Sequence, residues 1–110
     1  MRSPLWWRRL KAAILPARRL RVVEGDSLPD CLPIRDVVLA RDEDEDWCAG
    51  MRCPCGCGQK IELLLIKGVA PRWDLRFDVK GRPSLKPSIW VKSGCRSHFW
   101  LSSGRVRWCE

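Results

Sequence analysis

Two cysteine-bearing stretches decide the fold that this sequence predicts: Cys53-Pro-Cys-Gly-Cys-Gly58 and, further along the chain, Gly94-Cys-Arg-Ser-His98. The first stretch places three thiols at alternate positions of a turn rich in Pro and Gly. The second offers one thiol and one imidazole. Thiolates and imidazoles are the ligands of tetrahedral structural zinc. The pattern therefore predicts a metal ion that joins two loops, with strands between them.

Five side chains compete for the four positions of such a site. We favour Cys55 and Cys57 together with Cys95 and His98, and we keep Cys53 as the first substitute. Zn²⁺ is the expected metal. The alternative is a [2Fe–2S] cluster, which three cysteines and one histidine can hold and which would give an electron-transfer domain.

Disulfide bonds explain these cysteines less well than a metal does. The chain has 7 Cys, an odd number, and cysteines two residues apart are awkward to pair with each other. The N-terminus shows no secretory signal, so we expect reduced thiols and a cytoplasmic protein. Simple burial accounts for Cys31 or Cys48, but it does not explain three thiols in one turn.

The length of 110 residues allows one small domain, and 45% hydrophobic with 31% charged residues is a globular balance. A domain of this size buries only about 60–70% of its unfolded surface, so a metal staple would add needed stability. The chain has 7 Trp, 2 Phe and no Tyr. We therefore expect tryptophan to dominate the core.

The net charge of +8 is concentrated at the N-terminus, since residues 1–25 hold seven Lys/Arg and one Glu. We divide the chain into a basic arm, flexible or helical, over residues 1–19 and a zinc-binding β-rich domain over residues 20–110. An amphipathic helix over Leu5–Leu15 can contact nucleic acid, an anionic membrane surface or an acidic partner. No window approaches the ~20 apolar residues of a transmembrane segment.

Short apolar or alternating segments predict a mainly β fold. Residues Trp73 to Val79 alternate strictly, which predicts that the side chains of Trp73, Leu75, Phe77 and Val79 face the core. The acidic run Asp42–Asp46 is expected to be a surface turn. The fold class is a small single-domain zinc-stapled β-sheet or ribbon-like fold with a short basic arm. The predicted strands are Leu20–Glu24, Asp36–Ala40, Ile61–Ile66, Trp73–Val79, Ser88–Val91 and a terminal hairpin of His98–Leu101 with Arg105–Trp108.

Two catalytic arrangements are compatible with these residues. In the first, zinc keeps an open position for water, and Glu62 or Asp74 acts as the base. In the second, zinc takes Cys53, Cys55, Cys57 and Cys95, which releases His98 as the general base for Ser88 or Ser97. As ordinary structural residues, Ser88 would begin a strand and Ser97 would cap a turn.

Four runs of this sequence resemble a family of short bacterial proteins classed as a domain of unknown function. The resemblance covers about residues 20–109, and its most specific part is C-P-C-G-C-G with G-C-x-S-H-F. It implies a zinc-binding cytoplasmic domain encoded beside ubiquitin-like proteins and their E1- and E2-like enzymes in phage-defence operons, for which a peptidase role is suggested. The runs are Trp47–Ile61, Pro71–Leu75, Ser84–Trp90 and Gly94–Trp100.

The function predicted from the sequence is that of an accessory component of such a pathway, acting by binding a ubiquitin-like protein or its conjugating enzymes. The alternative is a peptidase that processes a ubiquitin-like protein, and a nucleic-acid-binding module is a further one. A closed metal site on a flat surface would favour the binding module. A cleft with an open metal position, or a serine within hydrogen-bond reach of His98, would favour the enzyme.

Overall fold

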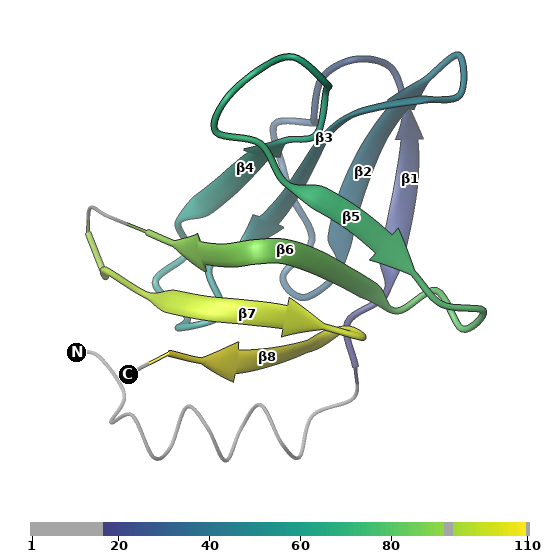
Figure 1. Ribbon diagram of the computed structural model, residues 1–110. Helices are drawn as coiled ribbons and strands as arrows, with labels where there is room; N and C mark the ends of the chain where they lie inside the picture. The colour runs from purple at the N-terminus through teal and green to yellow at the C-terminus, as the bar shows by residue number, and fades with distance from the viewer. Residues whose placement is uncertain (1–16, 92–93, 110) are drawn as a thin grey trace.

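The computed structural model describes residues 17–91 and 94–109, and every regular element among them is a β-strand. The strands form two four-stranded sheets, β1-β2-β3-β4 and β5-β6-β7-β8. The strands of the two sheets run across one another (Figure 1). The expected fold class, a small mainly β domain, is confirmed. The strands are β1 Leu20–Glu24, β2 Val37–Asp42, β3 Glu45–Arg52, β4 Lys60–Leu64, β5 Asp74–Phe77, β6 Pro83–Trp90, β7 His98–Ser102 and β8 Arg105–Trp108.

The first sheet is built around the β2-β3 hairpin. Its turn lies within the acidic run, where Glu43 and Asp44 adopt positive φ angles of 51° and 65°. β1 pairs with β2 in parallel, whereas β2-β3 and β3-β4 are antiparallel. The chain leaves β3 at Arg52 and returns as β4 at Lys60, so the cysteine-rich turn occupies the β3-β4 connection.

The second sheet is antiparallel throughout. The pairing of β6 with β7 is irregular, because the register shifts between Leu85 and Ile89. The second cysteine loop connects β6 to β7, and the β7-β8 hairpin ends the described chain. Both cysteine loops are therefore connections between neighbouring strands, one in each sheet.

The core lies between the two sheets and is mainly aliphatic, with Phe99 as its largest fully buried side chain. The expectation of a tryptophan core is wrong for the described residues. Trp73 and Trp108 pack only at its edge, and Trp90 and Trp100 are 58% and 42% exposed. Strand alternation gives the physical reason, since the inward positions are held by Leu, Ile and Val while these two indoles occupy outward positions.

The strand predicted over residues 73–79 is shorter in the structure, and its predicted inward face is partly wrong. Phe77 is 51% exposed and Val79 is fully exposed. The Asp78 carboxylate accepts hydrogen bonds from the backbone N–H groups of Lys80 and Arg82, at 2.9 and 3.0 Å. These bonds turn the chain at residue 78, so the alternation of the sequence does not continue as a strand.

The helix proposed for Leu5–Leu15 lies outside the described residues. Arg18, from the same predicted arm, is buried, and its guanidinium donates to the carbonyl of Arg35 at 2.8 Å. Its backbone N–H donates to the carbonyl of Gly104 at 2.7 Å. The segment before β1 is thus attached to the β7-β8 hairpin of the other sheet. Within the described parts of the chain, no helix has the length and apolar character needed to span a membrane.

Candidate metal centre and serine–histidine pair

The cysteine turn after β3 is closed by backbone hydrogen bonds. The Cys53 N–H donates to the carbonyl of Gln59 at 2.8 Å, and the Gly56 N–H donates to the carbonyl of Cys53 at 3.2 Å. Gly56 and Gly58 have φ angles of 91° and 81°, which side-chain-bearing residues rarely adopt. The glycines therefore allow a turn tight enough to direct alternate sulfurs to one point.

The β6-β7 loop approaches this turn closely at one glycine. A Cβ atom on Gly94 would lie 2.9 Å from the Gln59 side-chain oxygen. Because Gly94 has none, the loop can bring the next residue, Cys95, up to the turn. Two loops from different sheets meet at this position.

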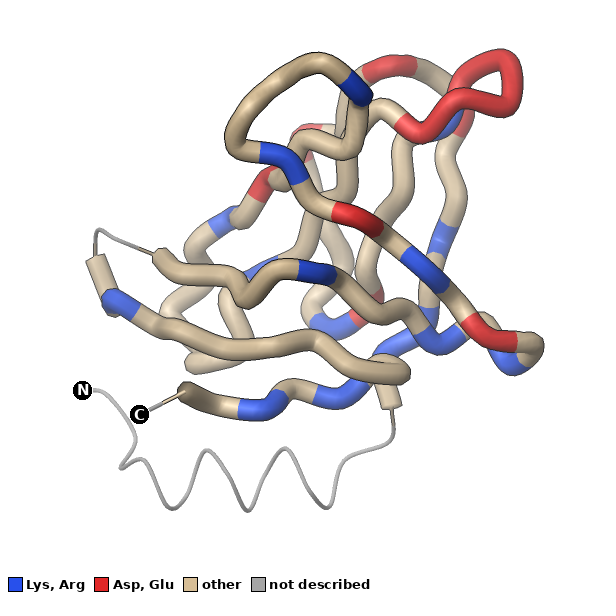
Figure 2. Tube along the Cα trace, viewed as in Figure 1, with Lys and Arg blue, Asp and Glu red and all other residues tan. Residues whose placement is uncertain are grey.

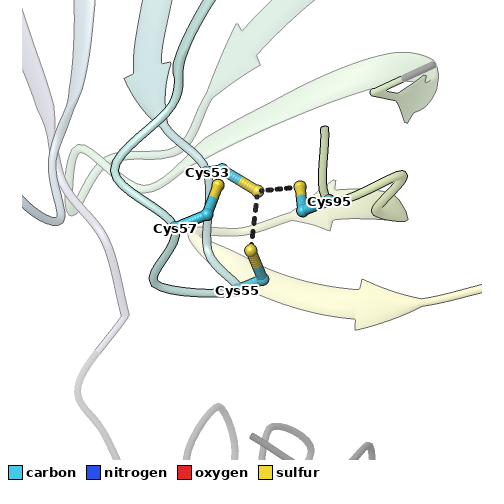
Figure 3. Close-up of side chains that lie close together, drawn as sticks. All are labelled: Cys53, Cys55, Cys57 and Cys95. Carbon is cyan, nitrogen blue, oxygen red and sulfur yellow. Dashed lines mark hydrogen bonds between the residues drawn. The ribbon is translucent and has the colours of Figure 1, made fainter. Parts of the chain in front are cut away.

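Four sulfur atoms converge where the loops meet (Figure 3). The Sγ atoms of Cys53, Cys55, Cys57 and Cys95 all lie within 4.8 Å of one another. The Cys53 sulfur is 3.4 Å from the sulfurs of both Cys55 and Cys95. A disulfide bond would require about 2.05 Å, whereas four thiolates around zinc at ~2.3 Å lie about 3.8 Å apart. The donor set and its spacing fit a tetrahedral metal ion.

The four thiols differ in burial. Cys53 and Cys95 are buried, Cys55 is half-buried and Cys57 is exposed. Burial raises the pKa of Cys53 and of Cys57. Burial also opposes ionisation of Cys95, but hydrogen bonds from the hydroxyl and backbone of Ser97 and from neighbouring thiols outweigh it and lower the pKa of Cys95 to about 6.

Ser97 belongs to this cluster. Its side chain is buried, and its Oγ lies 3.2 Å from the sulfur of Cys95 and 3.5 Å from that of Cys53. The proposed bases are placed elsewhere. Glu62 is exposed on β4, and Asp74 forms an ion pair with Arg72 at 2.9 Å. Neither carboxylate belongs to the metal-ligand group found among the described residues.

His98 is also outside that group, although the sequence favoured it as a metal ligand. Its Nε2 lies 2.8 Å from the Oγ of Ser88. Each member of this pair is followed in the chain by a buried residue, Ile89 after Ser88 and Phe99 after His98. Ile89 and Phe99 are register partners on β6 and β7. Alternation therefore places Ser88 and His98 on the outer face of the second sheet. The thiol cluster and the serine–histidine pair lie at opposite ends of the segment Cys95–His98.

The β6 bulge explains how two residues of different pairing register come into contact. Ser88 lies within the irregular segment between Leu85 and Ile89, next to Pro87, which has no N–H to donate to the ladder. A bulge bends the strand and redirects a side chain. Here the redirected hydroxyl reaches the imidazole of His98 on the neighbouring strand.

Two further contacts fix the pair. The ring of Trp90 stacks on that of His98, with centroids 5.2 Å apart and an interplanar angle of 18°. The indole N–H of Trp73 donates to the backbone carbonyl of Ser88 at 3.4 Å. The role of Trp90 was missed in the sequence, although its position two residues after Ser88 on a strand puts it on the same face.

Among the described residues, Ser88 is the hydrogen-bond partner that the structure gives the His98 ring. The pair is thus a dyad with an aromatic side chain against the imidazole. A hydroxyl within 2.8 Å of an imidazole nitrogen on an exposed face has the arrangement of a nucleophile beside its general base.

Comparison with known proteins yields one finding. A family model described as the bacterial ubiquitination-like system serine protease (BubE) matches residues 24–109. The expected resemblance to a bacterial family of ubiquitin-like systems is confirmed. Neither a curated protein nor a solved structure matches the chain.

Proposed function

We propose that this chain, which belongs to the bacterial ubiquitination-like system serine protease family, is a serine peptidase with Ser88 as nucleophile and His98 as general base. The observation that carries the proposal is the distance of 2.8 Å between Ser88 Oγ and His98 Nε2 on the outer face of the second sheet. The family description supports the reaction class. The contact between Ser88 and His98 supports the choice of residues.

The reaction begins when His98 Nε2 takes the proton of the Ser88 hydroxyl as its oxygen attacks the carbonyl carbon of the substrate. The tetrahedral intermediate then collapses, the C–N bond breaks, and His98 returns the proton to the leaving amine. Water attacks the resulting acyl ester, giving one proton to His98 and releasing the carboxylic acid product. The proton returns to Ser88, which restores the starting state.

In this proposal Zn²⁺ is held by Cys53, Cys55, Cys57 and Cys95 and has a structural role. Bound zinc would supply folding free energy, because four thiolates leave no position open for water or substrate. Cys95 and His98 are separated by only two residues. A metal-fixed loop would therefore hold the start of β7, and with it the imidazole, in a constant position.

The proposed substrate is a ubiquitin-like protein, either its precursor or its conjugate with another protein. The family's connection to a ubiquitination-like system supports this class of partner. The setting is a cytoplasmic phage-defence pathway, which agrees with a site that requires reduced thiols.

The test is labelling of the zinc-loaded full chain with a fluorophosphonate, followed by cleavage of a cognate ubiquitin-like precursor. We expect the label on Ser88, and we expect Ser88→Ala and His98→Gln to lower the cleavage rate by about 10²–10⁴-fold. Ser27→Ala changes an exposed serine far from the pair in sequence and serves as the matched control. Labelling at Ser97 instead, or no labelling of the folded protein, would overturn the proposal.

A further inference from the structure

A hollow of about 490 Å³ lies on the second sheet, on strands β6, β7 and β8. These are the strands that carry or neighbour the serine–histidine pair. On the outer face of the sheet its lining includes two hydroxyls, two cations and an indole. They are Ser84, Ser102, Lys86, Arg107 and Trp100, and Cys109 after β8 lines the same hollow.

The hollow begins directly beside the pair. Trp100 follows His98 by two residues on β7, and Lys86 precedes Ser88 by two residues on β6. Two residues of a regular strand such as β7 span about 7 Å, whereas β6 is irregular between Lys86 and Ser88. Trp100 and Arg107 are register partners on β7 and β8, so the hollow extends across the sheet from this point. A peptide whose scissile bond lies at Ser88 would place a residue two to four positions away in the hollow.

The positive charge of the hollow favours substrate residues with a negative charge. Lys86 and Arg107 are exposed, and the described part of the chain gives neither cation a carboxylate partner. The acidic residues of the β2-β3 turn are grouped at another end of the molecule, while β8 is basic (Figure 2). The outer face next to the pair therefore offers two positive charges beside an indole that is 42% exposed. The carboxylate opposite Lys86 in the register is that of Asp74, which is paired with Arg72.

We infer that this hollow is a substrate subsite for an acidic side chain, Asp or Glu, two to four residues from the bond that is cleaved. The inference rests on the proposed function, whose substrate it defines further. Lys86 and Arg107 approach the carboxylate from two different strands, and Trp100 packs against the carbon chain that carries it. The hydroxyls of Ser84 and Ser102 border the same space.

The experiment measures peptide binding separately from catalysis. Fluorescence anisotropy measures the affinity of the zinc-loaded Ser88→Ala chain for three rhodamine-labelled octapeptides. The peptides share ends of Gly and Ala, and their central three residues are all Glu, all Gln or all Lys. We expect the Glu peptide to bind at least about tenfold more tightly than the Gln peptide, as for a charge-assisted contact. Arg107→Glu and Lys86→Glu, each added to Ser88→Ala, should abolish this preference and favour the Lys peptide.

Arg76→Glu is the matched control, because Arg76 is an exposed cation on β5 of the same sheet and does not line the hollow. It makes the same change in net charge, so the Glu preference should survive. The proposed subsite would be ruled out if the Glu and Gln peptides bind equally well. It would also be ruled out if Arg76→Glu and Arg107→Glu reduce the preference for the Glu peptide equally. Fluorophosphonate labelling of the wild-type chain decides the proposed function independently of these binding results.

Discussion

His98 is the residue at which two chemistries compete, since an imidazole nitrogen can bind zinc or activate a serine. In the structure its Nε2 lies 2.8 Å from Ser88, and four thiols gather without it. The neighbouring residue, Ser97, points to the sulfurs of Cys53 and Cys95 instead. Two consecutive residues thus belong to different sites. The irregular segment of the neighbouring strand β6, which contains Pro87, supplies the hydroxyl of Ser88 to one of them.

Trp90 provides a test at the scale of one residue. Because its ring stacks on His98 and is 58% exposed, we expect it to orient the imidazole without supporting the core. An aromatic pair contributes about 0.5–1.5 kcal/mol, so Trp90→Ala should lower kcat by up to about tenfold. The melting temperature should change little. Steady-state kinetics on the precursor substrate and a thermal melt measure both effects.

A conservative variant and a control distinguish the orientation of the His98 imidazole by Trp90 from the general effect of losing an aromatic ring. Trp90→Phe keeps a ring against the imidazole and should retain most of the kcat. Phe77→Ala removes an aromatic side chain that is 51% exposed on β5, and its kcat should equal that of the wild type. Equal kcat in Trp90→Ala and the wild type would show that the stacking has no part in catalysis.

At the scale of elements, strand periodicity predicts the strands and turns that depend on neighbouring residues. It fails where contacts between residues distant in sequence determine the structure. The terminal hairpin was predicted closely, with β7 and β8 at His98–Ser102 and Arg105–Trp108, because alternation and the Ser-Ser-Gly turn are both local signals. The predicted end of this strand at Val79 was wrong, because hydrogen bonds to the Asp78 carboxylate turn the chain after β5. The sequence narrowed the metal ligands to five side chains and favoured His98 over Cys53. The structure instead brings the sulfur of Cys53 into the group and leaves His98 outside it, because the ligand set depends on how two loops from different sheets meet.

The β7-β8 turn gives a prediction at this scale. Gly104 has a φ of 77°, its N–H donates to the carbonyl of Pro83, and it receives a hydrogen bond from the Arg18 N–H. A Cβ at this position would overlap the backbone of Arg18. We expect Gly104→Ala to lower the free energy of unfolding by more than about 3 kcal/mol, through backbone strain and steric overlap together. Urea unfolding of the zinc-loaded chain measures this change.

Gly81→Ala is the matched control, since Gly81 has a similar φ of 73° with open space around its Cβ position. That substitution should cost only the strain of a left-handed backbone, about 1–2 kcal/mol. The difference between the two variants isolates the packing of the segment before β1 against the hairpin. Equal losses of stability would mean that this packing contributes nothing.

At the scale of the whole molecule, two sheets share one small core and several long-range attachments. One of these is the backbone contact of Arg18 with Gly104, and another is the thiol cluster, which joins the β3-β4 turn of one sheet to the β6-β7 loop of the other. Ionised thiols would repel one another in the absence of a cation. A metal ion bound to them would neutralise this charge and join the two sheets.

Removal of the metal should consequently unfold the domain. Structural zinc contributes about 10–16 kcal/mol in the smallest zinc domains, which exceeds the stability of most proteins of this size. We expect one zinc per chain by elemental analysis and no visible absorption bands, which iron–sulfur clusters would show. A chelator such as 1,10-phenanthroline should abolish the cooperative thermal transition, and re-addition of Zn²⁺ should restore it.

Cysteine variants test the same dependence without a chelator. Cys55→Ala and Cys95→Ala each remove one sulfur of the cluster and should lower the melting temperature by more than about 10 °C, since 1 kcal/mol corresponds to ~4 °C in a domain of this length. Cys31→Ala removes an exposed thiol outside the cluster and should keep both the zinc content and the melting temperature. If Cys95→Ala melts as the wild type does and still binds one zinc, the cluster is not what joins the sheets. The position of His98 would then depend on the packing of β7 alone, and its hydrogen bond with Ser88 should survive removal of the metal.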